Sequence, residues 1–139
     1  MMRLNPYITF NGEARAAMEF YRDVLGGELS INTFGEFGAP EGTDPDAVMH
    51  AFLETPDGFA LMASDQMPGG PEVSGDNITI SISGYLDEAD KMRSWFELLS
   101  DGGTVVTPLE KQMWGDEYGL LRDRFGIHWM VDFGEPQAE

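Results

Sequence analysis

The chain has 139 residues, 25 of them acidic and 8 basic, so its formal charge is −17. This length, with 42% hydrophobic residues, predicts one folded domain with an ordinary core. Eight scattered cations form no basic patch for nucleic acid or an anionic membrane. A chain without cysteine has no disulfide and no cysteine metal site. Because no apolar run reaches membrane-spanning length and the N-terminus lacks a signal-like core, we expect a cytoplasmic protein.

In the first half of the chain, one helical pattern lies among four strand patterns. The helix is predicted where apolar side chains recur every three or four positions before Gly26-Gly27. The strands are rich in β-branched and aromatic residues and are bounded by turn residues such as Asn11-Gly12. The predicted order is a strand at 4–10, the helix at 13–25, a strand at 28–34, an exposed loop at 35–45 and a hairpin of strands at 48–54 and 59–64.

The second half predicts the same order again. It follows a Pro/Gly-rich breaker, Met67-Pro68-Gly69-Gly70-Pro71, and its helical pattern ends at Gly102-Gly103. Its first strand alternates isoleucine with threonine and serine, which indicates one buried face. The predicted elements are a strand at 77–83, a helix at 87–101 and strands at 104–107, 119–122 and 127–133.

These two halves also align with each other residue by residue. Adding 75 to the numbers of Glu13 and Tyr21 gives Glu88 and Phe96, and adding 68 carries 58–62 onto 126–130. We therefore predict one domain, 1–139, built from repeats at about 4–66 and 76–133 with a linker at 67–75. An open sheet exposes an apolar face and unpaired edges, so each copy is expected to close on the other or on a second chain.

Short segments along nearly the whole chain are similar to one family of duplicated βαβββ proteins. They are Asn5-Pro6-Tyr7-Ile8-Thr9-Phe10, Ala17-Met18-Glu19-Phe20-Tyr21, Met49-His50-Ala51-Phe52-Leu53, Leu61-Met62-Ala63-Ser64-Asp65, Gln112-Met113-Trp114-Gly115-Asp116-Glu117-Tyr118-Gly119 and Asp123-Arg124-Phe125-Gly126-Ile127-His128-Trp129. On these segments the chain resembles the vicinal-oxygen-chelate superfamily, which includes glyoxalase I, extradiol dioxygenases and the fosfomycin and bleomycin resistance proteins. A narrower resemblance is to PhnB-like proteins, often labelled 3-demethylubiquinone-9 3-methyltransferase.

The resemblance implies an α+β fold with two βαβββ modules. These would form a curved eight-stranded mixed sheet around a cleft, with the helices outside, and a homodimer is expected because the superfamily commonly pairs its modules across chains. The methyltransferase label finds no support in the sequence. A nucleotide-type cradle needs glycines between a strand and a helix, whereas Gly26-Gly27 and Gly102-Gly103 follow helices.

Metal-dependent members, as the resemblance implies, take His or Glu ligands from the first and last strands of each module. The alignment places Tyr7 and Asn77 in the first-strand positions and Met62 and Met130 in the last-strand positions. Hard divalent ions bind thioethers and amides weakly. We therefore expect no metal at these positions and predict no cofactor.

The two histidines leave an alternative open. His50 shares a strand face with Glu54, and His128 shares one with Met130. If His50, His128 and Glu54 converged on a divalent metal, the protein could be a lyase, isomerase or dioxygenase with Tyr7 as acid or base. Otherwise each histidine hydrogen-bonds in or beside a polar cavity.

The preferred hypothesis is a protein that binds a small molecule in its cleft without metal. Trp114 and Tyr118 either form stacking walls or cap the end of the sheet, and the methionines either contact ligand or fill the core. A third possibility is a domain whose dimer surface matters more than its cleft. The ligand is expected to be largely apolar, no catalytic residue is assigned, and the predicted cleft residues are Tyr7, Thr9, His50, Met62, Asn77, Trp114, Tyr118, His128 and Met130.

Overall fold

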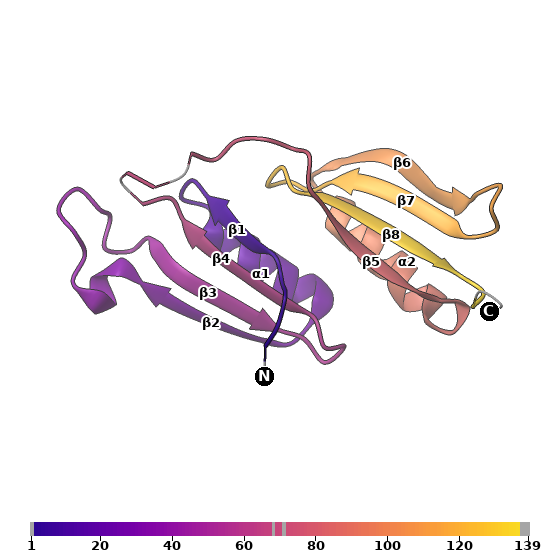
Figure 1. Ribbon diagram of the computed structural model, residues 1–139, viewed down its shortest axis with the longest axis horizontal. Coiled ribbons are helices and arrows are strands. Elements are labelled where there is room, and N and C mark those ends of the chain that lie inside the picture. The colour runs from indigo at the N-terminus through magenta and orange to yellow at the C-terminus, as the bar shows by residue number, and fades with distance from the viewer. Residues whose placement is uncertain (1, 68, 71, 137–139) are drawn as a thin grey trace. The chain divides into compact units, whose positions relative to one another are not determined.

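The computed structural model describes residues 2–67, 69–70 and 72–136. Its contacts divide the chain into two units, Met1–Gly75 (unit 1) and Asp76–Glu139 (unit 2). Each unit contains one long helix and a four-stranded sheet (Figure 1). Pro68 and Pro71 of the predicted linker lie outside the described residues. Within those residues, no helix is long and apolar enough to cross a membrane.

Unit 1 contains α1 on one face of a sheet with the strand order β1-β4-β3-β2 (Figure 1). β1 runs parallel to β4, and the other neighbours are antiparallel. Its elements are β1 (Tyr7–Phe10), α1 (Ala14–Leu25), β2 (Glu28–Thr33), the 3-10 helix η1 (Phe34–Phe37), β3 (Val48–Glu54) and β4 (Ala60–Asp65).

Unit 2 repeats this arrangement with α2 against a sheet of order β5-β8-β7-β6. Here β5 is parallel to β8. The elements are β5 (Thr79–Tyr85), the 3-10 helix η2 (Leu86–Glu88), α2 (Ala89–Ser100), β6 (Thr104–Lys111), β7 (Glu117–Arg122) and β8 (His128–Gly134).

The α+β fold of two βαβββ modules is thus confirmed, with its strands in two hydrogen-bonded sheets of four instead of one continuous sheet of eight. The reason is that the first strand of each module pairs with the last strand of the same module. β6 also continues four residues beyond its predicted end, through Pro108. An edge strand with register shifts tolerates proline because not every N–H is needed for pairing.

The side chains of each sheet alternate between a face covered by the helix and a helix-free face. On β4, Leu61, Ala63 and Asp65 are buried while the residues between them are partly exposed. Close helix–sheet packing depends on glycine just after each helix. A side chain at Gly27 would collide with the backbone of Glu54, and one at Gly103 would collide with the backbone of Arg122.

Candidate functional site

Tyr7 and His50 meet on the helix-free face of unit 1. The phenol Oη lies 3.1 Å from the imidazole Nδ1, and the two rings stack at 27° with their centroids 5.7 Å apart. Tyr7 belongs to β1 and His50 to β3, and β4 lies between these strands. The two side chains therefore reach toward each other across β4. The sequence predicted both residues as ligand-binding but gave no signal that they touch.

The surroundings of this pair mix apolar and polar side chains, and the register partner of His50 on β2 is Asn32, which donates to the carboxylate of Glu36 at 3.2 Å. Met62 on β4 is the register partner of both Tyr7 and Phe52, so the three side chains share one row of the helix-free face. The guanidinium of Arg3 lies 4.8 Å from the centre of the Phe52 ring and 4.0 Å from the carboxylate of Glu54. This face thus combines the Met62 thioether and the Phe52 ring with the Tyr7–His50 pair and the Arg3–Glu54 ion pair. Arg3 and Phe52 were missed by sequence reasoning.

Thr9 also points to this helix-free face. It is two residues from Tyr7 on β1, and its register partner is Ser64. Tyr7, Thr9, His50 and Met62 are therefore brought together on one sheet, as four of the nine predicted ligand-binding residues.

Unit 2 carries a pair of carboxyl groups on its own helix-free face. Asp132 on β8 is aligned with Tyr118 and Ser83 on the neighbouring strands. Burial, together with a hydrogen bond that protonated Asp132 donates to Asp116 and the charge of that residue, raises the pKa of Asp132 to about 6. The pair can hold a proton near neutral pH, which an ordinary surface aspartate cannot. Strand periodicity could have placed Asp132 on this face, since it alternates with buried residues on β8. Asp116 precedes β7, so no periodicity indicates its position.

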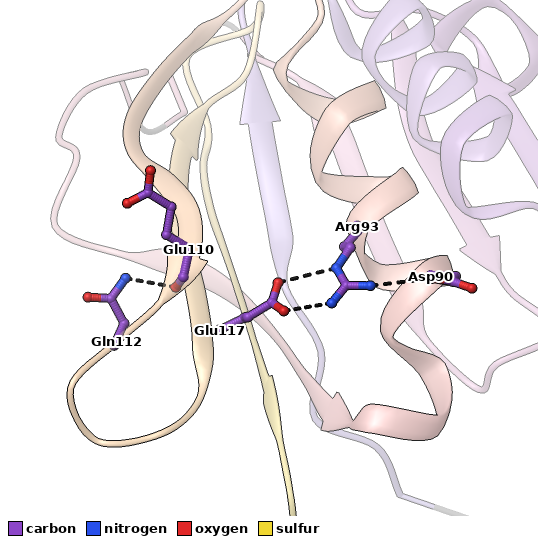
Figure 2. A network of polar contacts seen from close by, with 5 residues as sticks. All are labelled: Asp90, Arg93, Glu110, Gln112 and Glu117. Carbon is purple, nitrogen blue, oxygen red and sulfur yellow. Dashed lines mark hydrogen bonds and ion pairs between the residues drawn. The ribbon is translucent and has the colours of Figure 1, made fainter.

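Trp114 and Tyr118 lie next to this pair in the sequence and contact each other. Their ring centroids are 6.0 Å apart in an edge-on arrangement, and Trp114 is 59% exposed. Half of the indole surface is thus available to solvent at the β6–β7 turn. Gln112, at the same turn, donates its side-chain N–H to the backbone carbonyl of Glu110 at 2.9 Å (Figure 2).

A charged clamp holds the start of β7 against α2. Arg93 donates two hydrogen bonds to Glu117, at 2.6 and 3.2 Å, and one to Asp90 at 3.3 Å (Figure 2). Its guanidinium also lies 5.3 Å from the centre of the Phe133 ring. The Glu117 carboxylate raises the pKa of Arg93 above its usual value. By fixing Glu117, the clamp positions the adjoining residues Asp116 and Tyr118.

The remaining predicted residues lie along β8 or just before β5. His128 and Met130 share the helix-free face of unit 2, where Met130 is aligned with Ser81 and Leu120. Asn77 is exposed and precedes β5 by two residues. Since Ser81 faces Met130 as Tyr7 faces Met62, Ser81 occupies the first-strand position that the sequence alignment gave to Asn77. The isoleucine alternation indicated the buried face of this strand but could not fix its register.

The residues at the four first- and last-strand positions do not suit a divalent metal. They supply a phenol, a hydroxyl and the thioethers of Met62 and Met130, without a carboxylate or an imidazole. His50 and Glu54 are four residues apart on β3, roughly 13 Å along the strand. In the part of the chain that the structure describes, no three His, Asp or Glu side chains gather into a cluster that could hold a metal ion.

A separate depression of about 320 Å³ lies in unit 1 beside the N-terminus of α1. Its most buried polar group is the carboxylate of Asp65, which accepts the backbone N–H groups of Ala14 and Val48, each at 2.9 Å. Asp65 therefore joins the helix to β3 and has a structural role. The lining residues are Gly12, Arg15, Ala16, Glu19, Asp44, Asp46, Ala47, Val48 and Asp65.

Comparison with known proteins gives a consistent relationship over nearly the whole chain. The model of the Glyoxalase/Bleomycin resistance protein/Dioxygenase superfamily matches residues 3–131. YjdN from Escherichia coli is 30% identical over 148 residues, covering 98% of each protein. PA1353 from Pseudomonas aeruginosa, a crystal structure, is 36% identical with a TM-score of 0.82, covering 98% of this chain and all of that one (100%). A Bacillus cereus PhnB protein, described as a candidate 3-demethylubiquinone-9 3-methyltransferase, shares the fold at 20% identity and a TM-score of 0.75, covering 95% and 99% of the two chains.

Proposed function

The chain belongs to the Glyoxalase/Bleomycin resistance protein/Dioxygenase superfamily, and we propose that it binds a small, largely apolar molecule without the divalent metal used by many members. The observation that carries this proposal is the helix-free face of unit 1. There the Met62 thioether and the Phe52 ring lie in one row beside the hydrogen-bonded pair of Tyr7 and His50. Such a surface favours apolar contact, and a few fixed polar groups set the orientation of a ligand.

The chemistry of the donor groups supports binding without metal. Thioethers, a phenol and a serine hydroxyl are poor ligands for a hard divalent ion, and Met62 and Met130 instead offer flexible, polarisable side chains. Methionine adapts its shape to irregular apolar molecules. A face with these groups therefore gains more from contact with an apolar ligand than from coordination.

Exposed aromatic surface in unit 2 extends the proposal to that sheet. Trp114 is more than half exposed beside Tyr118, and the Asp116–Asp132 pair next to them supplies a proton donor near neutral pH. We propose that Trp114 contributes a stacking wall. A ligand bound here would meet an indole face and, below about pH 6, one protonated carboxyl group.

The alternative is a metal-dependent lyase, isomerase or dioxygenase that uses His50, His128 and Glu54. It is tested first by measuring the metal content of protein purified without an affinity tag. Melting is then followed with chelator and with added Zn, Ni, Mn or Fe. Metal-independent binding predicts substoichiometric metal and unchanged melting. Stoichiometric metal with a melting shift that His50→Ala abolishes would establish the alternative instead.

Ligand binding itself is tested by a melting-shift screen. A library of metabolites and antibiotics is applied to the wild-type protein, and hits are repeated with Trp114→Ala and with Met62→Ala. The proposal expects at least one small apolar compound to raise the melting temperature, and expects a substitution on the binding face to weaken that effect. A library without hits, or hits that ignore both substitutions, contradicts it.

A further inference from the structure

Building on the proposed function, we propose that the Tyr7–His50 pair is the polar anchor of the site and that its ligand is a planar aromatic molecule with one weakly acidic hydroxyl. The pair lies on a face that presents rings and a thioether, and it contains the one imidazole of unit 1. The ligand class follows from three properties of this arrangement: the free nitrogen of His50, the charge of the protein and the orientation of the rings.

The first property is the hydrogen-bonding capacity of His50. Its Nδ1 is occupied by Tyr7, and within the described residues no second side chain bonds to the ring, so Nε2 is available to a ligand. A neutral imidazole donates at one nitrogen and accepts at the other, while a phenol can do either. When Tyr7 donates to Nδ1, Nε2 donates outward; when Nδ1 donates to Tyr7, Nε2 accepts. A ligand hydroxyl, itself donor and acceptor, fits both arrangements.

The second property is the charge around the pair. The chain carries a net charge of −17, which opposes the approach of a molecule that is already anionic, such as a carboxylate. A weakly acidic hydroxyl arrives neutral and ionises only as it shares its proton with Nε2. The resulting charge-assisted hydrogen bond is about twice as strong as a neutral one. Arg3 lies over Phe52 on the same face, but it is already paired with the carboxylate of Glu54 at 4.0 Å, so the His50 imidazole is the group that receives the proton.

The third property is the flatness of the surface. The phenol and imidazole rings are close to parallel, at 27°, and Met62 lies in register beside Tyr7. Aromatic rings and a methionine sulfur pack favourably against another planar ring. Tyr7 remains 51% exposed, so its ring has surface left for such contact. An aliphatic ligand of equal size would lose this stacking.

The test compares two probes that differ only at the oxygen. 4-Nitrophenol has a weakly acidic hydroxyl, and its ionisation changes its visible absorbance; 4-nitroanisole has the same ring with the hydroxyl methylated. Binding is titrated with wild-type protein, His50→Gln and Tyr7→Phe. Tyr85→Phe, at an exposed tyrosine of unit 2, is the matched control, and His128→Gln serves only to assign the histidine NMR signals. Far-UV circular dichroism confirms that each variant is folded.

We expect His50→Gln to weaken 4-nitrophenol binding by about tenfold or more, the effect of losing one hydrogen bond to a charged group. The affinity of Tyr85→Phe for 4-nitrophenol and the affinity of His50→Gln for 4-nitroanisole should equal those of the wild-type protein. Because the chain has two histidines, imidazole nitrogen signals in NMR spectra can be assigned with the two glutamine variants. Bound 4-nitrophenol should shift the His50 signals and not those of His128, and Tyr7→Phe should change the tautomer balance of His50 in the free protein.

Two results would overturn the proposal: one contradicts the role of the Tyr7–His50 pair, and the other contradicts the ligand class. If both probes bind and His50→Gln affects neither, the face binds apolar molecules but Tyr7 and His50 do not anchor them. If 4-nitrophenol does not bind at all, the ligand class is wrong. The proposed function fails separately, when the melting-shift library also gives no hit on the wild-type protein.

Discussion

Replacing Asp132 with asparagine should stabilise unit 2 at neutral pH. Its pKa is about 6 in the folded chain, against 3.8 for an unperturbed aspartate, because burial and Asp116 disfavour the charged form. Between these values the folded state holds a proton that the unfolded state releases. Stability from this group is therefore complete below about pH 4 and is lost as pH rises through about 6. Asp132→Asn keeps the shape and removes the charge.

The size of the effect follows from the shift in pKa. A difference of about two units corresponds to about 3 kcal/mol, and solvent screening at this half-buried position reduces the expected gain to about 1–2 kcal/mol at pH 7.5. All three tryptophans, Trp95, Trp114 and Trp129, belong to unit 2. Urea unfolding followed by tryptophan fluorescence therefore reports on the unit that contains Asp132.

The matched control for this experiment is Glu97→Gln, which removes one exposed charge from the same unit. Wild type and Asp132→Asn should converge in stability near pH 4 and separate as pH rises to 7.5, whereas Glu97→Gln should follow wild type closely. Equal stabilisation by both variants would attribute the effect to net charge alone. Destabilisation of Asp132→Asn at pH 7.5 would refute the shared proton.

Three further substitutions test the packing that positions the site. Gly27→Ala should lower the free energy of unfolding by about 3 kcal/mol or more, because the new methyl group would collide with the Glu54 backbone at a φ of +107°. Gly38→Ala, where the new methyl group meets open space at a φ of +75°, should lower it by about 1 kcal/mol. Urea unfolding followed by circular dichroism separates the two. Asp65→Asn should lower the free energy of unfolding by about 2–3 kcal/mol, because the asparagine NH₂ would face a backbone N–H donor in place of a carboxylate oxygen. Asp23→Asn, at an exposed position, is the control and should change stability little in the same assay. Arg93→Ala should lower the urea midpoint followed by circular dichroism more than Arg22→Ala does, because Arg93 makes a two-point contact with Glu117 and covers Phe133. Similar midpoints would show that the clamp contributes little.

Much of the fold could be predicted because its signals are local and repeated. Apolar spacing predicts helices at 13–25 and 87–101. In the structure α1 starts one residue later than predicted and α2 starts two residues later. Errors occurred where pairing decides the bounds. β5 is two residues later than predicted, and β6 continues past Pro108, because partners on neighbouring strands select the register.

The candidate site was predictable only in part, since its contacts join residues far apart in the chain. Tyr7 and His50 were selected as ligand-binding residues, but their hydrogen bond crosses an intervening strand, and no sequence spacing encodes that reach. The pairing of Asp116 with Asp132 likewise depends on how a turn returns the chain to β8. Periodicity identifies the face of a strand but not which side chains on that face meet.

The glycines after the two helices have a consequence for how this duplicated chain can diversify. A side chain at Gly27 would collide with the backbone of Glu54, and one at Gly103 would collide with the equivalent backbone of Arg122. Each copy therefore needs glycine at this position. The helix-free faces of the two sheets, by contrast, differ from each other in the side chains that they present. There one copy has an imidazole–phenol couple while the other has two acids beside an indole. The two modules thus share one close backbone contact and differ in the polar and aromatic groups of their helix-free faces, so a ligand specific for one module need not bind the other.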